Sequence, residues 1–146
     1  MFADFIKSLF QDDPEPLTDH DARIPLTALL VRLARSDNDY AAAEMIRIEQ
    51  IAQTRFGLTK PEASRLRADA EQFESEAPDT VRFTRAIKEA VPYEARIGVI
   101  EALWQVALAD GERDQHEDAL IRLAANLLGV NDRDSALARQ RVDTQG

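Results

Sequence analysis

The chain has 146 residues and a formal net charge of −9, from 27 Asp and Glu residues against 18 Lys and Arg residues. This acidity argues against a protein that binds nucleic acid or an anionic membrane through its charge, and the absence of cysteine excludes disulfides, thiolate metal sites, iron–sulfur clusters and cysteine nucleophiles. With only 5 Gly and 6 Pro, the chain lacks the turn residues of an all-β domain, so its many strong helix formers predict an all-α protein.

The first 21 residues differ in composition from the rest of the chain. Residues 1–10 carry Phe, Ile and Leu at helical spacing, which predicts a short amphipathic helix that docks on the core; a partner or a membrane surface is the alternative. Residues 11–21 are acidic, contain two prolines and are expected to form a linker. Because neither a signal peptide nor a membrane span is recognisable, the expected location is the cytoplasm.

Residues 22–146 are expected to form one helical domain. Apolar residues recur there at every third or fourth position, and Gly57, Pro92 and Gly129 stop the pattern. Together with residues 1–10, the pattern predicts a single-domain bundle of seven to eight helices. The helices predicted after the linker span residues 23–36, 40–56, 60–76, 79–90, 93–109, 114–128 and 132–142.

Two segments of the chain, residues 29–52 and 102–125, are similar when one is shifted by 73 positions. Each reads as a helix, an acidic break and a second helix, and such a unit needs a neighbour to bury its apolar face. The bundle is therefore predicted to consist of two similar helix–acidic loop–helix halves. The matched pairs are Leu30 and Leu103, Leu33 and Val106, Ala34 and Ala107, Asp37 and Asp110, Glu44 and Glu117, and Ile48 and Ile121.

The matched acidic residues give the repeat its functional interest. Packing of the two halves would bring Asp37, Glu44, Asp110 and Glu117 into one region, where carboxylates repel one another unless they are protonated or bridged by a cation. Ca²⁺, Mg²⁺ and Mn²⁺ prefer oxygen ligands of this kind, and Zn²⁺ is retained as a further candidate. One prediction is therefore a site for a divalent cation.

Helix capping is the alternative interpretation, and the sequence leaves both open. Asp114 and Glu117 match a capping box, in which the residue before the helix and a glutamate three positions later satisfy each other's backbone amides. Glu44 has Ala41 three positions before it, and an alanine side chain cannot cap, so the first break is harder to explain in this way. Neither break has the ligand spacing of an EF-hand loop.

Around the second break the sequence resembles the TerB-like tellurite-resistance family. The similarity is carried by WQVALADGERDQHEDALIRLAANLLGV at residues 104–130. It extends upstream through FTRAIKEAVPYEARIGVIEALW and FGLTKPEASRLRADAEQFE, so that it covers about residues 20–142. The first break departs from the family pattern, because the chain has SDND at residues 36–39 where the family has ADGE.

The resemblance implies an all-helical bundle of two similar halves that binds a divalent metal through acidic residues at its helix junctions. It also associates the chain with tellurite resistance and stress responses. Related modules occur beside J-domains and in membrane-associated complexes, so any membrane association is expected to be indirect. The family brings no established catalytic activity. The residues that the resemblance implicates as metal ligands are Asp37, Asp39 and Glu44 in the first half and Asp110, Glu112 and Glu117 in the second.

No active-site motif accompanies these carboxylates. The sequence has no glycine-rich phosphate loop, nucleophile elbow or His-Glu-x-x-His pattern. We therefore predict a non-catalytic module that binds a divalent cation and a protein partner. The alternatives are a protein interaction domain whose acidic residues only cap helices, and a metal-dependent hydrolase. We further expect that His116 is exposed and that Trp104 belongs to the core. Arg82, Arg85 and Lys88 are expected to form a solvated basic stripe, with a partner-binding face as the alternative.

Overall fold

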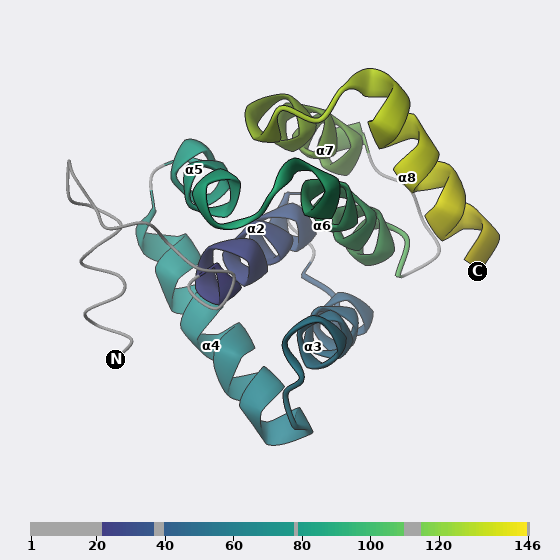
Figure 1. The fold of residues 1–146 in the computed structure, drawn as a ribbon. Coiled ribbons are helices and arrows are strands. Elements are labelled where there is room, and N and C mark those ends of the chain that lie inside the picture. Colours follow the sequence, from purple (N-terminus) through teal and green to yellow (C-terminus); the bar gives the residue numbers. More distant parts are fainter. Residues whose placement is uncertain (1–21, 37–39, 78, 110–114, 146) are drawn as a thin grey trace.

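The computed structural model describes residues 22–36, 40–77, 79–109 and 115–145, and these residues form an all-α fold (Figure 1), as the composition predicted. The helices are α2 (Arg23–Arg35), α3 (Ala42–Phe56), α4 (Lys60–Glu76), α5 (Val81–Ala90), α6 (Tyr93–Ala107), α7 (Gln115–Leu128) and α8 (Asp132–Gln145). The amphipathic helix and linker expected at residues 1–21 lie outside the described residues. Among the residues that are described, no helix is both long enough and apolar enough to cross a membrane.

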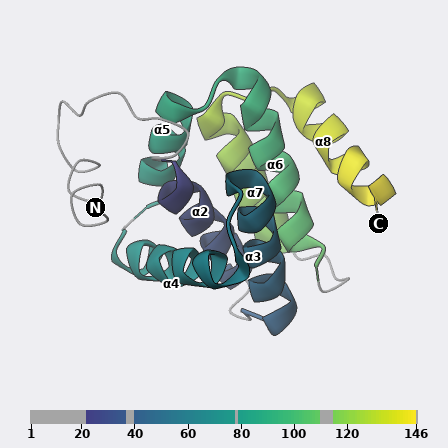
Figure 2. The same ribbon diagram turned by 60° about the horizontal axis from the view of Figure 1, so that its bottom comes forward.

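Helix α2 lies at the centre of the bundle (Figures 1 and 2). It contacts α3, α4, α5, α6 and α7. Nine of its 13 residues are buried, among them Leu26, Leu29, Leu30 and Leu33, because this helix is apolar around most of its circumference. The other helices can therefore cover it from several sides, which makes α2 the shared core element of both halves.

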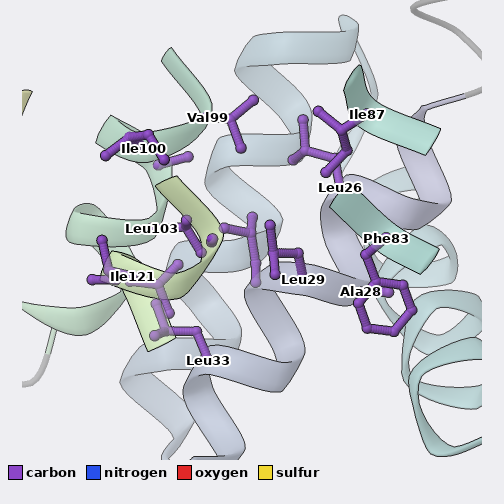
Figure 3. Packing of buried hydrophobic residues seen from close by; sticks show 14 of the residues in the cluster. Leu26, Ala28, Leu29, Leu33, Phe83, Ile87, Val99, Ile100, Leu103 and Ile121 are labelled. Atoms are coloured by element: carbon purple, nitrogen blue, oxygen red, sulfur yellow. The ribbon is translucent and has the colours of Figure 1, made fainter. Parts of the chain in front are cut away.

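The core is formed where side chains from α5, α6 and α7 meet those of α2. Figure 3 shows Leu33 of α2 beside Ile121 of α7, and Leu26 of α2 beside Ile87 of α5, with Leu103 of α6 between the helices. All five side chains are at most 1% exposed. Burying a side chain of this size contributes about 1.5–3 kcal/mol, so these contacts add substantially to the stability of the fold.

The internal repeat is visible in the fold. Helices α3 and α7 begin at Ala42 and Gln115, which are 73 positions apart, as the shifted segments predicted. Both helices are followed by a glycine with a positive φ, 65° at Gly57 and 75° at Gly129, a conformation that glycine adopts without steric cost. The halves pack across one another, since α2 contacts α6 and α7, and α3 contacts α6.

Several boundaries differ from the expected ones by a few residues. Helix α3 begins at Ala42 rather than residue 40, because the backbone of Ala41 is extended. Helix α6 ends at Ala107, and α8 continues beyond residue 142.

On α7 the side chain of Leu123 is 46% exposed, whereas Ile121 is buried. Helix α7 thus has more apolar residues than its buried face can hold, and Leu123 lies outside that face.

Candidate metal site

Two of the six predicted ligands, Glu44 and Glu117, lie in described helices, and both are buried. Each is the third residue of its helix, since α3 begins at Ala42 and α7 at Gln115. Their exposed fractions are 1% and 2%. The repeat therefore places two buried carboxylates at equivalent positions in the first helical turn, where the helix dipole favours negative charge.

Glu44 has a local structural role that the sequence analysis did not assign to it. Its Oε1 atom accepts a hydrogen bond from the backbone N–H of Ala41 at 3.0 Å. This bond is the glutamate half of a capping box, and it forms although Ala41 offers no side-chain acceptor in return. The expectation that Ala41 makes capping a poor explanation of the first break is therefore wrong, because the glutamate needs only the backbone amide.

A capping glutamate elsewhere in the chain shows that capping does not require burial. Glu62 on α4 accepts a hydrogen bond from the backbone N–H of Thr59 at 2.9 Å, yet its side chain is exposed. That backbone hydrogen bond is the main reason why the pKa of Glu62 is lowered from its ordinary value. An exposed carboxylate suffices to cap α4, so capping alone does not require the burial that Glu44 and Glu117 have.

The other four predicted ligands, Asp37, Asp39, Asp110 and Glu112, lie outside the described residues. Within the ranges that the structure describes, no three His, Asp or Glu side chains form a group that would hold a metal ion. The convergence of all six carboxylates therefore stays a prediction.

The described helices connect the two junctions. We call residues 37–39 the first acidic segment and residues 110–114 the second. Helix α7 carries Glu117 and contacts α2, the helix that precedes the first acidic segment. Helix α3 carries Glu44 and contacts α6, the helix that precedes the second acidic segment. Figure 3 shows Leu33, in the last turn of α2, beside Ile121, one turn after Glu117. Each buried glutamate thus lies on a helix that packs against the helix leading into the other half's acidic segment.

Side chains on both sides of the first acidic segment are held together. The Tyr40 hydroxyl donates to Oε2 of Glu71 at 2.7 Å. Arg67 donates to the same oxygen at 2.6 Å and to Oε2 of Glu49 at 2.7 Å, so it joins α4 to α3. The Arg35 guanidinium lies 5.3 Å from the centroid of the Tyr40 ring. This network was not predicted, because the apolar spacing of α4 does not indicate which polar side chains of other helices its polar face meets.

A comparison with known protein families identifies the chain. The model of the TerB family, described as tellurite resistance protein TerB, matches residues 23–140. The chain belongs to the TerB family. The resemblance found around the second acidic segment is thereby confirmed. Searches among curated proteins and among solved structures give no significant match to this TerB-family chain.

The exposure of three other features of this TerB-family chain agrees with the sequence-based expectations. His116 is exposed on the first turn of α7, as expected. Trp104 is only 7% exposed and belongs to the core. On α5, Arg85 and Lys88 are exposed and Arg82 is half-buried, which agrees with a basic stripe at the surface.

The two tyrosines of this TerB-family chain are expected to resist ionisation in the folded state. Burial, followed by the hydrogen bond to Glu71, raises the pKa of Tyr40, and the hydrogen bond to Asp134 raises the pKa of Tyr93. Because both folded-state pKa values lie above the unfolded value, these groups contribute fully to stability below about pH 10, and their contribution is lost as the pH rises further.

Ultraviolet difference spectroscopy at about pH 10.5 measures this effect directly, because that pH lies just above the ordinary tyrosine pKa. The folded protein should contain less tyrosinate than the same protein unfolded in urea. Equal tyrosinate absorbance in the two states would contradict the prediction.

Proposed function

We propose that this chain is a non-catalytic module that binds a divalent cation through the acidic residues at its two helix junctions. The observation that carries the proposal is the burial of Glu44 and Glu117 at equivalent positions of the two halves. A buried carboxylate is costly unless hydrogen bonds, protonation or positive charge compensate it. Glu44 accepts a hydrogen bond from Ala41, and a cation shared with the acidic segments would add positive charge at both carboxylates.

The donor set fits a hard cation. All six predicted ligands are carboxylates, the oxygen donors that Ca²⁺, Mg²⁺ and Mn²⁺ prefer, and the chain has no cysteine to favour a softer metal. In this proposal Glu44 and Glu117 would hold the ion from the first turns of α3 and α7. The remaining ligands would be Asp37, Asp39, Asp110 and Glu112 from the two acidic segments. The cross-packing of α2 with α7 and of α3 with α6 supports the approach of the two junctions.

A protein interaction domain without a metal is the second candidate, and the hydrogen bond from Ala41 to Glu44 favours it. In that case both glutamates would act only as helix caps. Within either candidate we further propose that the module works in the cytoplasm, in a stress response, together with a protein partner. Membership of the TerB family supports this role.

A thermal melt of the chelator-stripped protein, alone and with Ca²⁺, Mg²⁺, Mn²⁺ or Zn²⁺, tests the proposal. A bound ion at a hundredfold excess over its Kd stabilises the folded state by about 2.7 kcal/mol, which raises the Tm by several degrees. We expect a selective rise with one or more of the first three ions. The double variants Asp37→Asn with Asp110→Asn, and Glu44→Gln with Glu117→Gln, should both lose it.

Glu62→Gln is the matched control, because it changes a capping glutamate that is exposed. It should retain the full cation-dependent rise in Tm. Gln at positions 44 and 117 still offers an amide oxygen to the backbone, so loss of capping would not explain a lost response. If no ion raises the Tm of the unmodified protein, the metal proposal is wrong and the interaction domain is favoured instead.

A further inference from the structure

We propose that Tyr40 is a positioning residue for the cation site: through Glu71 and Arg67 it fixes the start of α3, and thereby Glu44, against α4. The inference rests on the proposed function and goes beyond it. It names a residue outside the predicted ligand set that sets the affinity of the first half for the cation.

The hydrogen bonds around Tyr40 anchor α3 to α4 on both sides of Glu44. Tyr40 lies four positions before Glu44, and its hydroxyl is 2.7 Å from Oε2 of Glu71. Glu49 lies five positions after Glu44, and its Oε2 is 2.7 Å from Nε of Arg67. Arg67 joins the two anchors, because its Nη1 donates to the same Glu71 oxygen that Tyr40 uses.

These anchoring groups are largely shielded from solvent. The side chains of Arg67, Glu49 and Glu71 are 20%, 15% and 24% exposed. Ion pairs at such positions are screened less by water and salt than those on an open surface. The network is therefore able to hold one geometry rather than exchange among several.

The other side of the first acidic segment is attached to α4 as well. Arg35 stacks on the Tyr40 ring, and its Nε is 3.5 Å from Oε1 of Glu74. Nη2 of Arg32 is 3.4 Å from the other oxygen of Glu74 and donates to the carbonyl of Ala77 at 2.8 Å. The residues before and after the first acidic segment are thus both fixed to α4.

The second half has different residues at the positions equivalent to this network. Shifted by 73 positions, Arg35 corresponds to Leu108, Tyr40 to Arg113 and Glu49 to Arg122. A leucine forms no ion pair, and the equivalent of Arg67 is Gln140, so the pair that Glu49 forms with Arg67 has no counterpart at these positions. The residues of the network around Tyr40 are therefore not repeated at the equivalent positions of the second half.

A metal ligand on a helix whose position is already fixed loses less conformational entropy when the ion binds, so the affinity for the ion is higher. Replacing residues that orient metal ligands lowers metal affinity by about 10- to 100-fold. We expect Tyr40→Phe, which deletes one hydrogen bond and keeps the ring under Arg35, to raise the Kd about tenfold, at the lower end of that range.

Isothermal titration of the chelator-stripped full chain with Ca²⁺, and separately with Mn²⁺, tests this expectation. Tyr93→Phe is the control, because Tyr93 also donates to a carboxylate, Asp134 at 2.8 Å, but between α6 and α8. The Kd of Tyr93→Phe should equal that of the unmodified protein. Glu71→Ala removes the acceptor from the opposite side and should weaken binding at least as much as Tyr40→Phe. Adding Tyr40→Phe to Glu71→Ala should then have no further effect.

The outcomes separate this inference from the proposed function. If the unmodified protein binds Ca²⁺ or Mn²⁺ and Tyr40→Phe binds equally well, the positioning role is wrong while the cation site stands. The same conclusion follows if Tyr40→Phe lowers the Tm of the ion-free protein without changing the Kd, since that result describes a purely structural residue. If the unmodified protein binds neither ion, the proposed function fails, and the positioning role fails with it.

Discussion

Replacing Phe83 by alanine is expected to lower the free energy of unfolding by about 3–5 kcal/mol. The side chain is fully buried, and its ring centroid lies 5.4 Å from that of Phe73. On the α2 side, the Arg32 guanidinium lies 4.7 Å from the Phe83 centroid. Three helices thus meet at this ring, and an alanine would leave a cavity that their backbones could fill only in part. Urea unfolding followed by circular dichroism measures the change.

Val81→Ala is the matched control for this prediction, because it removes apolar atoms from the same helix. Val81 is 41% exposed, so its replacement should change the free energy of unfolding by about 0.5 kcal/mol or less. A loss below about 1 kcal/mol for Phe83→Ala would mean that α5 contributes little to the core, against the range typical of a buried ring.

The fold was predictable because its helical pattern is strong and local. Leucines at positions 26, 29, 30 and 33 mark a face that only a helix brings together, and all four are buried. Thr59 and Glu62 predicted the start of α4, and the structure has both hydrogen bonds of that capping box. Where side chains at the start of a helix accept hydrogen bonds from its first backbone amides, the sequence alone locates the start of that helix.

Other features depended on packing that no local pattern contains. Leu120, Leu123, Ala124, Leu127 and Leu128 all contribute to the apolar pattern of α7, yet Leu123 is 46% exposed. Which apolar residues are buried is decided by the helices that happen to cover α7, and here α2, α5 and α6 do so. Periodicity identifies a helix with more certainty than it identifies the buried face of a helix with apolar residues on several sides.

The candidate site was predictable in part. The repeat identified Glu44 and Glu117 as an equivalent pair, and the structure adds that both are buried, which spacing alone does not indicate. The residues around Tyr40 could not be found in the same way. Glu71 lies 31 positions from Tyr40, and Arg67 lies 18 positions from Glu49. Contacts of this kind follow from the angle between α3 and α4, which depends on the packed core.

Arg96 provides the second large expected effect, although no motif drew attention to it. Its guanidinium donates to the carbonyl of Val91 at 2.9 Å, of Lys88 at 3.0 Å and of Leu128 at 3.2 Å. These carbonyls belong to the C-terminal ends of α5 and α7, where the last turn of a helix lacks partners and carries partial negative charge. One cation on α6 thus satisfies the ends of two other helices.

We expect Arg96→Met to lower the free energy of unfolding by about 2–4 kcal/mol, because hydrogen bonds to charged groups contribute about 1.5–3 kcal/mol each and are not additive. Methionine retains much of the apolar stem, so the loss reports on the guanidinium rather than on packing. Arg141→Met is the control. Arg141 pairs with Glu101 at a site where its side chain is 47% exposed, and such pairs contribute about 0–1 kcal/mol.

Arg96→Lys distinguishes the charge from the shape of the side chain. A lysine keeps the positive charge near the two helix ends, but its single ammonium group cannot reach three carbonyls that the planar guanidinium reaches in different directions. We therefore expect Arg96→Lys to recover less than half of the stability that Arg96→Met loses. Full recovery would show that charge at the helix ends is sufficient. In that case the junction of α5, α6 and α7 would be held by the helix dipoles and not by the three individual hydrogen bonds.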